Sequence, residues 1–289
     1  MSMAGYVEIF EVGPRDGLQN EARAIPVSEK IALVNCLGGA GFRRIEVASF
    51  VSPKWVPQMA DSAAVLAGIT RVPGVSYAAL TPNMRGFEDA VAAGADEVAI
   101  FGSASEGFSR ANINRSIAES LDGFAPVAEA AKARGLPVRG YVSCVVECPY
   151  DGPVAPAQVA RVAQALFAMG CYEVSLGDTI GRADPDAVAA MLRAVCEVVP
   201  PEHLAGHFHD TGGRALDNME VSLAAGLRVF DAAAGGLGGC PYAPGAAGNV
   251  ATEAVAARLA ALGYDTGLDP AVLDRAAAMA RAMRGNAHV

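Results

Sequence analysis

The sequence predicts a (β/α)₈ barrel, in which eight parallel strands alternate with helices. Helical stretches separate eight short apolar segments, which begin near residues 7, 44, 75, 97, 138, 172, 204 and 228. These segments are apolar on both faces, as parallel strands covered by helices are. A helix end, a glycine and a strand follow one another at Gly41, Gly94, Gly170 and Gly226, each glycine being expected just after the helix at C′. An open, doubly wound sheet is the main alternative.

The elements follow in order along the chain. The first strand runs from about Tyr6 to Val12 and ends in the polar segment 13–20. Ser28 is a candidate N-cap for the helix that follows. After that helix, we expect strands at 44–50, 75–81, 138–144 and 204–210, with others after the remaining glycine junctions. Further helices are predicted at 83–93, 112–134, 155–169, 185–199, 213–225, 249–263 and 270–284. The helices from about residue 249 onward would close or flank the barrel.

Composition limits the class of protein. The 289 residues are 52% hydrophobic and carry a net charge of -9, with only three lysines, so neither nucleic acid nor an anionic membrane is an expected partner. No run is long and apolar enough for a membrane span, and the N-terminus does not have the pattern of a signal peptide. The scattered cysteines suit a reducing compartment. We therefore expect a cytoplasmic enzyme.

Charged side chains fall at or near the ends of several predicted strands. They are Arg15, Asp16, Glu46, Arg139, Asp178, His207 and His209. The active site of a (β/α)₈ barrel lies at the carboxyl ends of its strands, so this pattern indicates a functional site. The alternative is a set of structural salt bridges, such as Arg15 with Glu46 and Arg139 with Asp178, and we expect part of it to be true because buried charges are normally paired.

His207 and His209 lie two residues apart on a predicted strand, so both imidazoles leave the same face. Such a pair can bind a metal ion. A hydrogen-bonded pair without a metal is an equal alternative, because the motif alone is short. Phe208 and Asp210 point away and are expected to pack and to cap.

The Gly-rich segment 235–248 contains a single thiol, Cys240. The segment matches neither a Walker loop nor a dinucleotide-binding fingerprint. A flexible loop of this kind suits a lid that delivers a proton donor. The alternative for Cys240 is a small buried hydrophobic residue. Asn249 follows the loop and could be the N-cap of the next helix.

Five segments together carry a family resemblance. They are GPRDGLQNE, ASFVSPKWVPQM, SLGDTIG, GHFHDTGG and GLGGCPYAPGAAGNVATE. From about Val7 to Gly267 the chain resembles 3-hydroxy-3-methylglutaryl-CoA lyases, which belong to a wider family of metal-dependent barrel enzymes that form or cleave carbon–carbon bonds. The resemblance implies one catalytic domain over residues 1–289, of the pyruvate carboxyltransferase-like type, and a small-molecule acyl-CoA substrate.

The resemblance also implies roles for individual residues. The metal ligands would be Asp16, His207, His209 and Asn249, and this oxygen and nitrogen set suits Mg²⁺ or Mn²⁺. Arg15 matches the substrate-contacting arginine of these lyases, and Cys240 matches their active-site cysteine. Residues in other matching segments have less defined roles in catalysis or substrate binding, namely Glu46, Asp178, Gln19 and Arg139.

The implied reaction is a retro-Claisen cleavage to acetyl-CoA and acetoacetate, a step of leucine breakdown and ketone-body formation in the family. A metal ion would acidify the C3 hydroxyl, and Asp178 or His207 would take its proton. Cys240 would then protonate the enolate carbon, since a thiol is mostly protonated at neutral pH. Alternatives are a lyase for another branched 3-hydroxyacyl-CoA, a related condensing synthase, and a catalytically silent binding protein. The oligomeric state stays open, a homodimer being one option.

Overall fold

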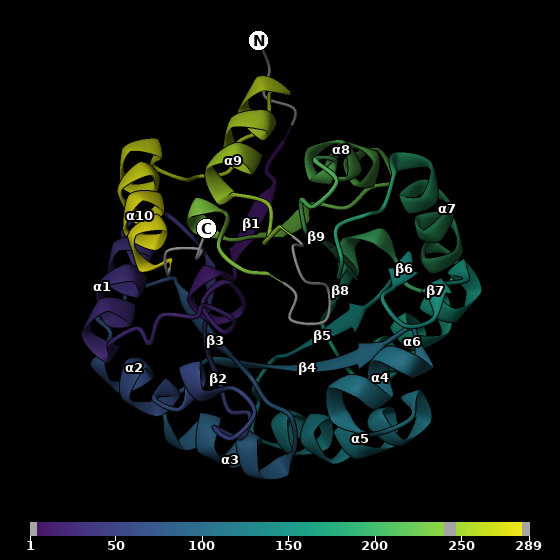
Figure 1. The fold of residues 1–289 in the computed structure, drawn as a ribbon, viewed down its shortest axis with the longest axis horizontal. Helices are drawn as coiled ribbons and strands as arrows, with labels where there is room; N and C mark the ends of the chain where they lie inside the picture. Colours follow the sequence, from purple (N-terminus) through teal and green to yellow (C-terminus); the bar gives the residue numbers. More distant parts are fainter. Residues whose placement is uncertain (1–4, 240–246, 285–289) are drawn as a thin grey trace.

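A computed structural model of the protein describes residues 5–239 and 247–284. Eight strands form a closed barrel in the order β1-β10-β9-β8-β5-β4-β3-β2, and all neighbours are parallel (Figure 1). The prediction of a (β/α)₈ barrel is therefore confirmed, and the open sheet is excluded. The strands are β1 (Glu8–Glu11), β2 (Arg44–Ser49), β3 (Ser76–Leu80), β4 (Glu97–Ser103), β5 (Val138–Ser143), β8 (Glu173–Asp178), β9 (Leu204–Phe208) and β10 (Val229–Ala232).

A ring of helices surrounds the barrel (Figure 1). They are α1 (Val27–Gly38), α2 (Ser62–Gly68), α3 (Met84–Ala92), α4 (Glu106–Ile113), α5 (Ile117–Ala133), α6 (Pro156–Ala168), α7 (Pro185–Cys196), α8 (Ala215–Ala224), α9 (Thr252–Ala261) and α10 (Pro270–Met283). The helix predicted at 112–134 begins later, because Asn114 ends α4 in the left-handed region at φ 54° and Ser116 then forms a capping box with Glu119.

Two local expectations were wrong. Ser28 does not cap α1, because the helix already begins at Val27 after Pro26. Gly94, Gly170 and Gly226 have positive φ at C′ as expected, whereas Gly41 lies two residues beyond the C-cap Gly39. The structure also contains a small antiparallel hairpin that was not predicted, made of β6 (Glu147–Cys148) and β7 (Gly152–Pro153).

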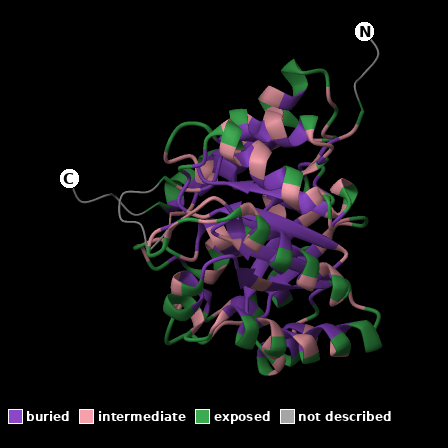
Figure 2. Ribbon diagram, turned by 90° about the vertical axis from the view of Figure 1, so that its right-hand side faces the viewer, coloured by how far each residue is buried: buried purple, intermediate pink, exposed green. Residues whose placement is uncertain are grey.

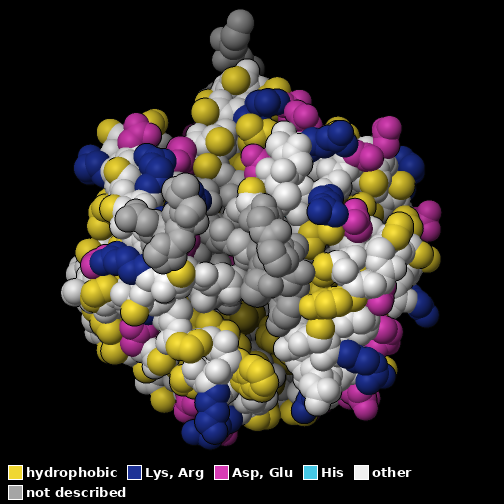
Figure 3. All heavy atoms as spheres, in the orientation of Figure 1, with side chains coloured by type: hydrophobic (Ala, Val, Ile, Leu, Met, Phe, Trp, Pro, Cys, Tyr) yellow, Lys and Arg dark blue, Asp and Glu magenta, His cyan; other side chains and the backbone are white. Residues whose placement is uncertain are grey.

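The hydrophobic core lies between the barrel and the inner faces of the helices, while the outer helix faces are exposed (Figure 2). On the face drawn in Figure 3, basic and acidic side chains alternate around the rim of the molecule. No helix within residues 5–239 and 247–284 is long and apolar enough to cross a membrane.

The turn after β1 is fixed by a buried carboxyl group. Glu11 Oε1 accepts hydrogen bonds from the backbone N–H groups of Gly13 and Ala234, each at 2.9 Å, and Thr252 Oγ1 donates to Oε2 at 2.7 Å. The chain then forms a single π-helical turn, Gly13–Gly17. A Cβ on Gly13 would lie 2.5 Å from Glu11 Oε1, so a larger residue would displace the carboxyl group from its backbone donors. Glu11 thereby joins this turn to the segments that follow β10.

We predict that Glu11 makes stability depend on pH. Burial raises the pKa of Glu11 from 4.5 to about 7. Between these two pH values the folded chain therefore keeps a proton on Glu11 that the unfolded chain has lost. The free energy of unfolding should therefore fall as pH rises through this window. Glu11→Gln mimics the protonated form and should be more stable than the wild type by about 2–3 kcal/mol at pH 8, with little difference near pH 5.

Urea unfolding at pH 5 and pH 8 measures this difference. The exposed Glu88 provides the control, because Glu88→Gln removes a carboxylate that is already solvated. If Glu11→Gln and Glu88→Gln showed the same pH dependence as the wild type, the ionisation of Glu11 would not be linked to folding.

Candidate active site

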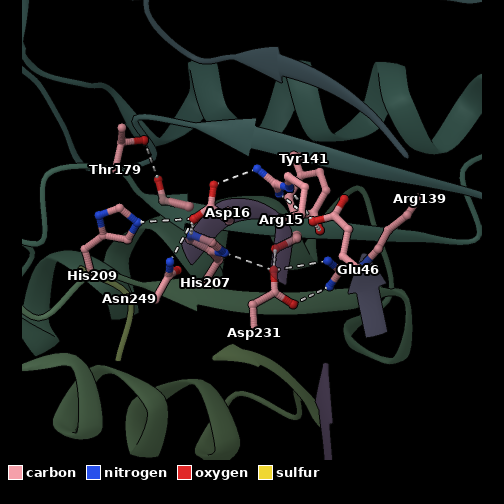
Figure 4. Close-up of polar contacts among 12 residues, drawn as sticks. Arg15, Asp16, Glu46, Arg139, Tyr141, Thr179, His207, His209, Asp231 and Asn249 are labelled. Carbon is pink, nitrogen blue, oxygen red and sulfur yellow. Dashed lines mark hydrogen bonds and ion pairs between the residues drawn. The ribbon is translucent and has the colours of Figure 1, made fainter. Parts of the chain in front are cut away.

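Three side chains converge at the carboxyl ends of the strands. Asp16 lies in the turn after β1, His207 lies in β9, and His209 follows directly after that strand. One ligand atom of each lies within 4.8 Å of the others, and Asp16 Oδ2 is 3.9 Å from Nε2 of both histidines (Figure 4). Arg15 and Asp16 come from a turn that the amide groups around Glu11 hold in place, so the cluster is built on rigid backbone.

Asn249 completes the group from the other side. Its Nδ2 donates to Asp16 Oδ2 at 2.8 Å and to the carbonyl of Leu237 at 3.2 Å. Its Oδ1 is buried and has no hydrogen-bond partner among the described residues. The alternative role of Asn249 as an N-cap is wrong, because α9 begins at Thr252 and its cap residue is Ala251.

The donor atoms of this group fit a divalent cation. A carboxylate oxygen and two imidazole nitrogens face one another, and the amide group of Asn249 contacts the same carboxylate through Nδ2, while its Oδ1 has no hydrogen-bond partner among the described residues. Burial alone would raise the pKa of Asp16, but Arg15 and the two histidines hold it well below its usual range, so Asp16 is ionised. Asp16, His207 and His209 therefore form a site that could hold a metal ion.

Arg15 is held between two carboxylates. Its Nε and Nη2 lie 2.7 Å and 2.5 Å from Glu46 Oε2, and its Nη1 donates to Asp16 Oδ1 at 2.6 Å. Tyr141 donates to the same Glu46 oxygen at 3.0 Å, and its ring lies beneath the guanidinium group. Burial alone would lower the pKa of Arg15, but Glu46 and Asp16 raise it, so the charge is fixed. The predicted salt bridge between Arg15 and Glu46 is confirmed.

Gln19 lies beside Asp16 and donates from Nε2 to Asp16 Oδ1 at 2.9 Å. This oxygen therefore accepts from both Arg15 and Gln19, whereas the other carboxylate oxygen, Oδ2, faces the histidines. The division fixes the plane of the carboxylate and leaves Oδ2 toward the cluster.

The predicted salt bridge between Arg139 and Asp178 is wrong. Arg139 is the second residue of β5, far below the carboxyl end of that strand, and it pairs with Glu173 and Asp231. Asp178 is the last residue of β8 and accepts hydrogen bonds from the backbone N–H groups of Ala183 at 2.9 Å and Arg182 at 3.4 Å. The two residues lie at different levels of the barrel, which the strand lengths alone did not reveal.

The sequence reasoning missed Asp231, whose carboxylate Oδ2 is 3.0 Å from Nδ1 of His207. Asp231 is buried in the otherwise apolar strand β10, next to His207 in the register between β10 and β9. An isolated acid inside an apolar strand was the available signal. Asp210 was interpreted correctly, since its Oδ1 accepts from the N–H of Ala215 at the start of α8. Cys240 lies outside the described residues.

The fold and the site define a class: a (β/α)₈ barrel with a candidate metal site at the carboxyl ends of its strands. Residues 6–279 match the HMGL-like family, and the chain belongs to that family. A Pseudomonas aeruginosa relative, 3-hydroxy-3-isohexenylglutaryl-CoA/hydroxy-methylglutaryl-CoA lyase, is 58% identical over 93% of this chain and 90% of its own length.

Solved structures are similarly close. The crystal structure of the HMG-CoA lyase from Brucella melitensis is 62% identical, with a TM-score of 0.96, and covers 97% of this chain and 99% of its own. The structure of an HMG-CoA lyase from Acinetobacter baumannii in complex with coenzyme A and 3-methylmalate is 37% identical, with a TM-score of 0.91, and covers 96% of this chain and 91% of its own.

We predict that Glu46→Ala destabilises the fold by about 3–5 kcal/mol, because it leaves the buried Arg15 without its main partner. The comparison is Glu29→Ala, which breaks the exposed pair of Arg23 and Glu29 and should cost no more than about 1 kcal/mol. Urea unfolding in the presence of chelator gives both values. Equally small losses would mean that the charge of Arg15 does not depend on Glu46.

Proposed function

We propose that the protein is a hydroxymethylglutaryl-CoA lyase, which cleaves 3-hydroxy-3-methylglutaryl-CoA to acetyl-CoA and acetoacetate. The observation that carries this proposal is the position of the charged Arg15 directly beside the Asp16, His207 and His209 cluster, in a chain of the HMGL-like family. The close relatives are named as lyases of this kind. A relative in complex with coenzyme A supports an acyl-CoA as the substrate class.

The cofactor that we propose is Mg²⁺ or Mn²⁺, held by Asp16, His207, His209 and Asn249. Mixed oxygen and nitrogen donors favour these ions over a closed zinc site, in which cysteine and histidine usually fill all positions. When bound, the cation would supply Lewis-acid stabilisation of negative charge on the substrate oxygens. We also infer that residues 1–289 form a single catalytic domain, because α9 and α10 pack against the barrel (Figure 1).

Arg15 would bind the substrate and stabilise the enolate. Its guanidinium is held by Glu46 and Asp16, so the positive charge does not need to reorient as negative charge grows on the thioester oxygen. Gln19 and Glu46 act through this arrangement, Gln19 by fixing Asp16 and Glu46 by fixing Arg15.

The substrate C3 hydroxyl must lose a proton, and the contacts of the two candidate bases differ. Asp178 pairs in register with Phe208, which packs outside the barrel, and its carboxylate accepts backbone N–H groups of the loop after β8. These contacts support a role in shaping that loop. His207 faces the inside of the site, 3.9 Å from Asp16. As a cation ligand, His207 would not take the proton itself, so we propose that the hydroxyl loses its proton to solvent on the side of Asp16 and His207.

The enolate carbon then needs a proton, and the thiol of Cys240 is our proposed donor. The S–H bond breaks as the new C–H bond forms, and solvent restores the thiol. The support is the Gly-rich segment around Cys240 and its match to the lyase motif.

The test of the proposed function is incubation with 3-hydroxy-3-methylglutaryl-CoA and Mg²⁺ or Mn²⁺. We expect acetoacetate and acetyl-CoA in equal amounts, loss of activity after treatment with chelator, and recovery on adding either ion. Absence of products with a protein that binds Mn²⁺ would reject the lyase assignment.

We predict that Cys240→Ser lowers kcat by about 10²-fold or more, because a serine hydroxyl is a far weaker acid than a thiol. Affinity for Mn²⁺ should not change. The control is Cys196→Ser in the outer helix α7, which should retain wild-type turnover. Full turnover by Cys240→Ser would contradict the assigned role.

A second candidate substrate has a longer branch at C3. It is favoured by the relative that is 58% identical and is named for both 3-hydroxy-3-isohexenylglutaryl-CoA and hydroxymethylglutaryl-CoA. Comparison of kcat/KM for the two thioesters decides between a strict and a broad lyase.

A further inference from the structure

Asp231 lies inside the barrel, where its carboxylate contacts three polar side chains. Its Oδ1 accepts from Arg139 Nη2 at 2.7 Å, and its Oδ2 accepts from Ser175 Oγ at 2.7 Å and from Arg139 Nη1 at 3.1 Å. The same Oδ2 is 3.0 Å from Nδ1 of His207 (Figure 4). The carboxylate is therefore held at both oxygens and meets one of the histidines of the cluster.

The strands fix this contact. Asp231 and His207 are partners in the parallel register of β10 and β9, so their side chains lie next to each other on the inner face of the barrel. Both residues are buried, so water does not compete for the hydrogen bond.

The contact determines which nitrogen of His207 carries the hydrogen. Both oxygens of Asp231 accept from the guanidinium of Arg139, and Oδ2 also accepts from Ser175, so the group is a carboxylate that can only accept a hydrogen bond from His207. Nδ1 of His207 must then be the donor. The lone pair that remains is on Nε2, which faces Asp16.

We propose that Asp231 is a positioning residue that holds His207 with Nδ1 protonated and Nε2 directed at a divalent cation. This inference rests on the cation of the proposed function. A carboxylate behind a ligating histidine fixes the orientation of the ring and makes it a stronger ligand.

Arg139 connects Asp231 to groups nearer the amino ends of the strands. Its Nε donates to Glu173 at 2.7 Å, and its guanidinium lies 4.2 Å from the ring centroid of Phe10. With all of these groups in place, the Asp231 carboxylate cannot rotate away from His207. Arg139, expected to bind substrate, would instead support the site from below, through Asp231.

His209 provides an internal contrast. Its Nε2 is also 3.9 Å from Asp16, but its Nδ1 is buried without a hydrogen-bond partner among the described residues. The two histidines would therefore not contribute equally to cation binding, because only the ring of His207 is oriented by a hydrogen bond at Nδ1.

The first test measures Mn²⁺ affinity in the absence of substrate, by electron paramagnetic resonance of the free ion. Asp231→Asn should raise the Kd by about 10- to 100-fold. The matched control is Glu97→Gln, which changes another buried carboxyl group of the barrel that accepts from Tyr172 and is hydrogen-bonded to neither Arg139 nor His207, and its Kd should stay within about threefold of the wild type. Thermal unfolding and circular dichroism check that both variants fold.

An unchanged Kd in Asp231→Asn would overturn the proposal. An equal loss in both variants would also overturn it, because a general loss of charge balance would then explain the effect. Failure of the lyase assignment is distinguishable, since a wild-type protein that binds Mn²⁺ without cleaving the thioester leaves this inference intact.

A second test needs no variant. Nuclear magnetic resonance of ¹⁵N-histidine-labelled wild-type protein with Mg²⁺ should show His207 protonated at Nδ1 and unprotonated at Nε2. The opposite tautomer would overturn the proposal, whether or not Asp231→Asn folds.

Discussion

Charges buried inside the barrel must be neutralised, and the rest of the structure depends on how this is done. Barrels of this type usually fill their interior with branched apolar side chains. Here Arg139, at 1% exposure, lies between Glu173 and Asp231, and Arg15 lies between Glu46 and Asp16. An unpaired ion at such depth would cost several kcal/mol. Each arginine therefore fixes two carboxylates.

The two arginines lie at different levels and so have different effects. Arg139 lies near the amino end of its strand and acts on Asp231, which faces His207. Arg15 lies at the carboxyl end of β1 and acts on Asp16 directly. Both ionic groups end at the same cluster of candidate ligands. The cluster thus has fixed orientations before any ligand arrives, which lowers the cost of reorganisation on binding.

The sequence was sufficient for the strands and for most of the cluster. Strand positions follow from local signals, namely apolar runs and glycines after helices, and Asp16 and the two histidines lie in short motifs. The partner of Arg139 was not predictable in this way. It depends on the register between β5 and β8, which pairs Arg139 with Glu173, and register is set by contacts across the barrel. Asp231 could have been noticed as an acid in an apolar strand, but its contact with His207 depends in the same way on the register between β10 and β9.

Stability does not account for these buried ions. Replacing a buried ion pair with apolar side chains of similar volume is often neutral or stabilising, because the attraction between the charges only repays the cost of removing them from water. What apolar residues cannot do is accept a hydrogen bond from Nδ1 of His207 or hold the guanidinium of Arg15 at a fixed point. The interior charges of this barrel are therefore best understood as a means of orienting the site. The hydrophobic layer between strands and helices offsets the free-energy cost of burying them.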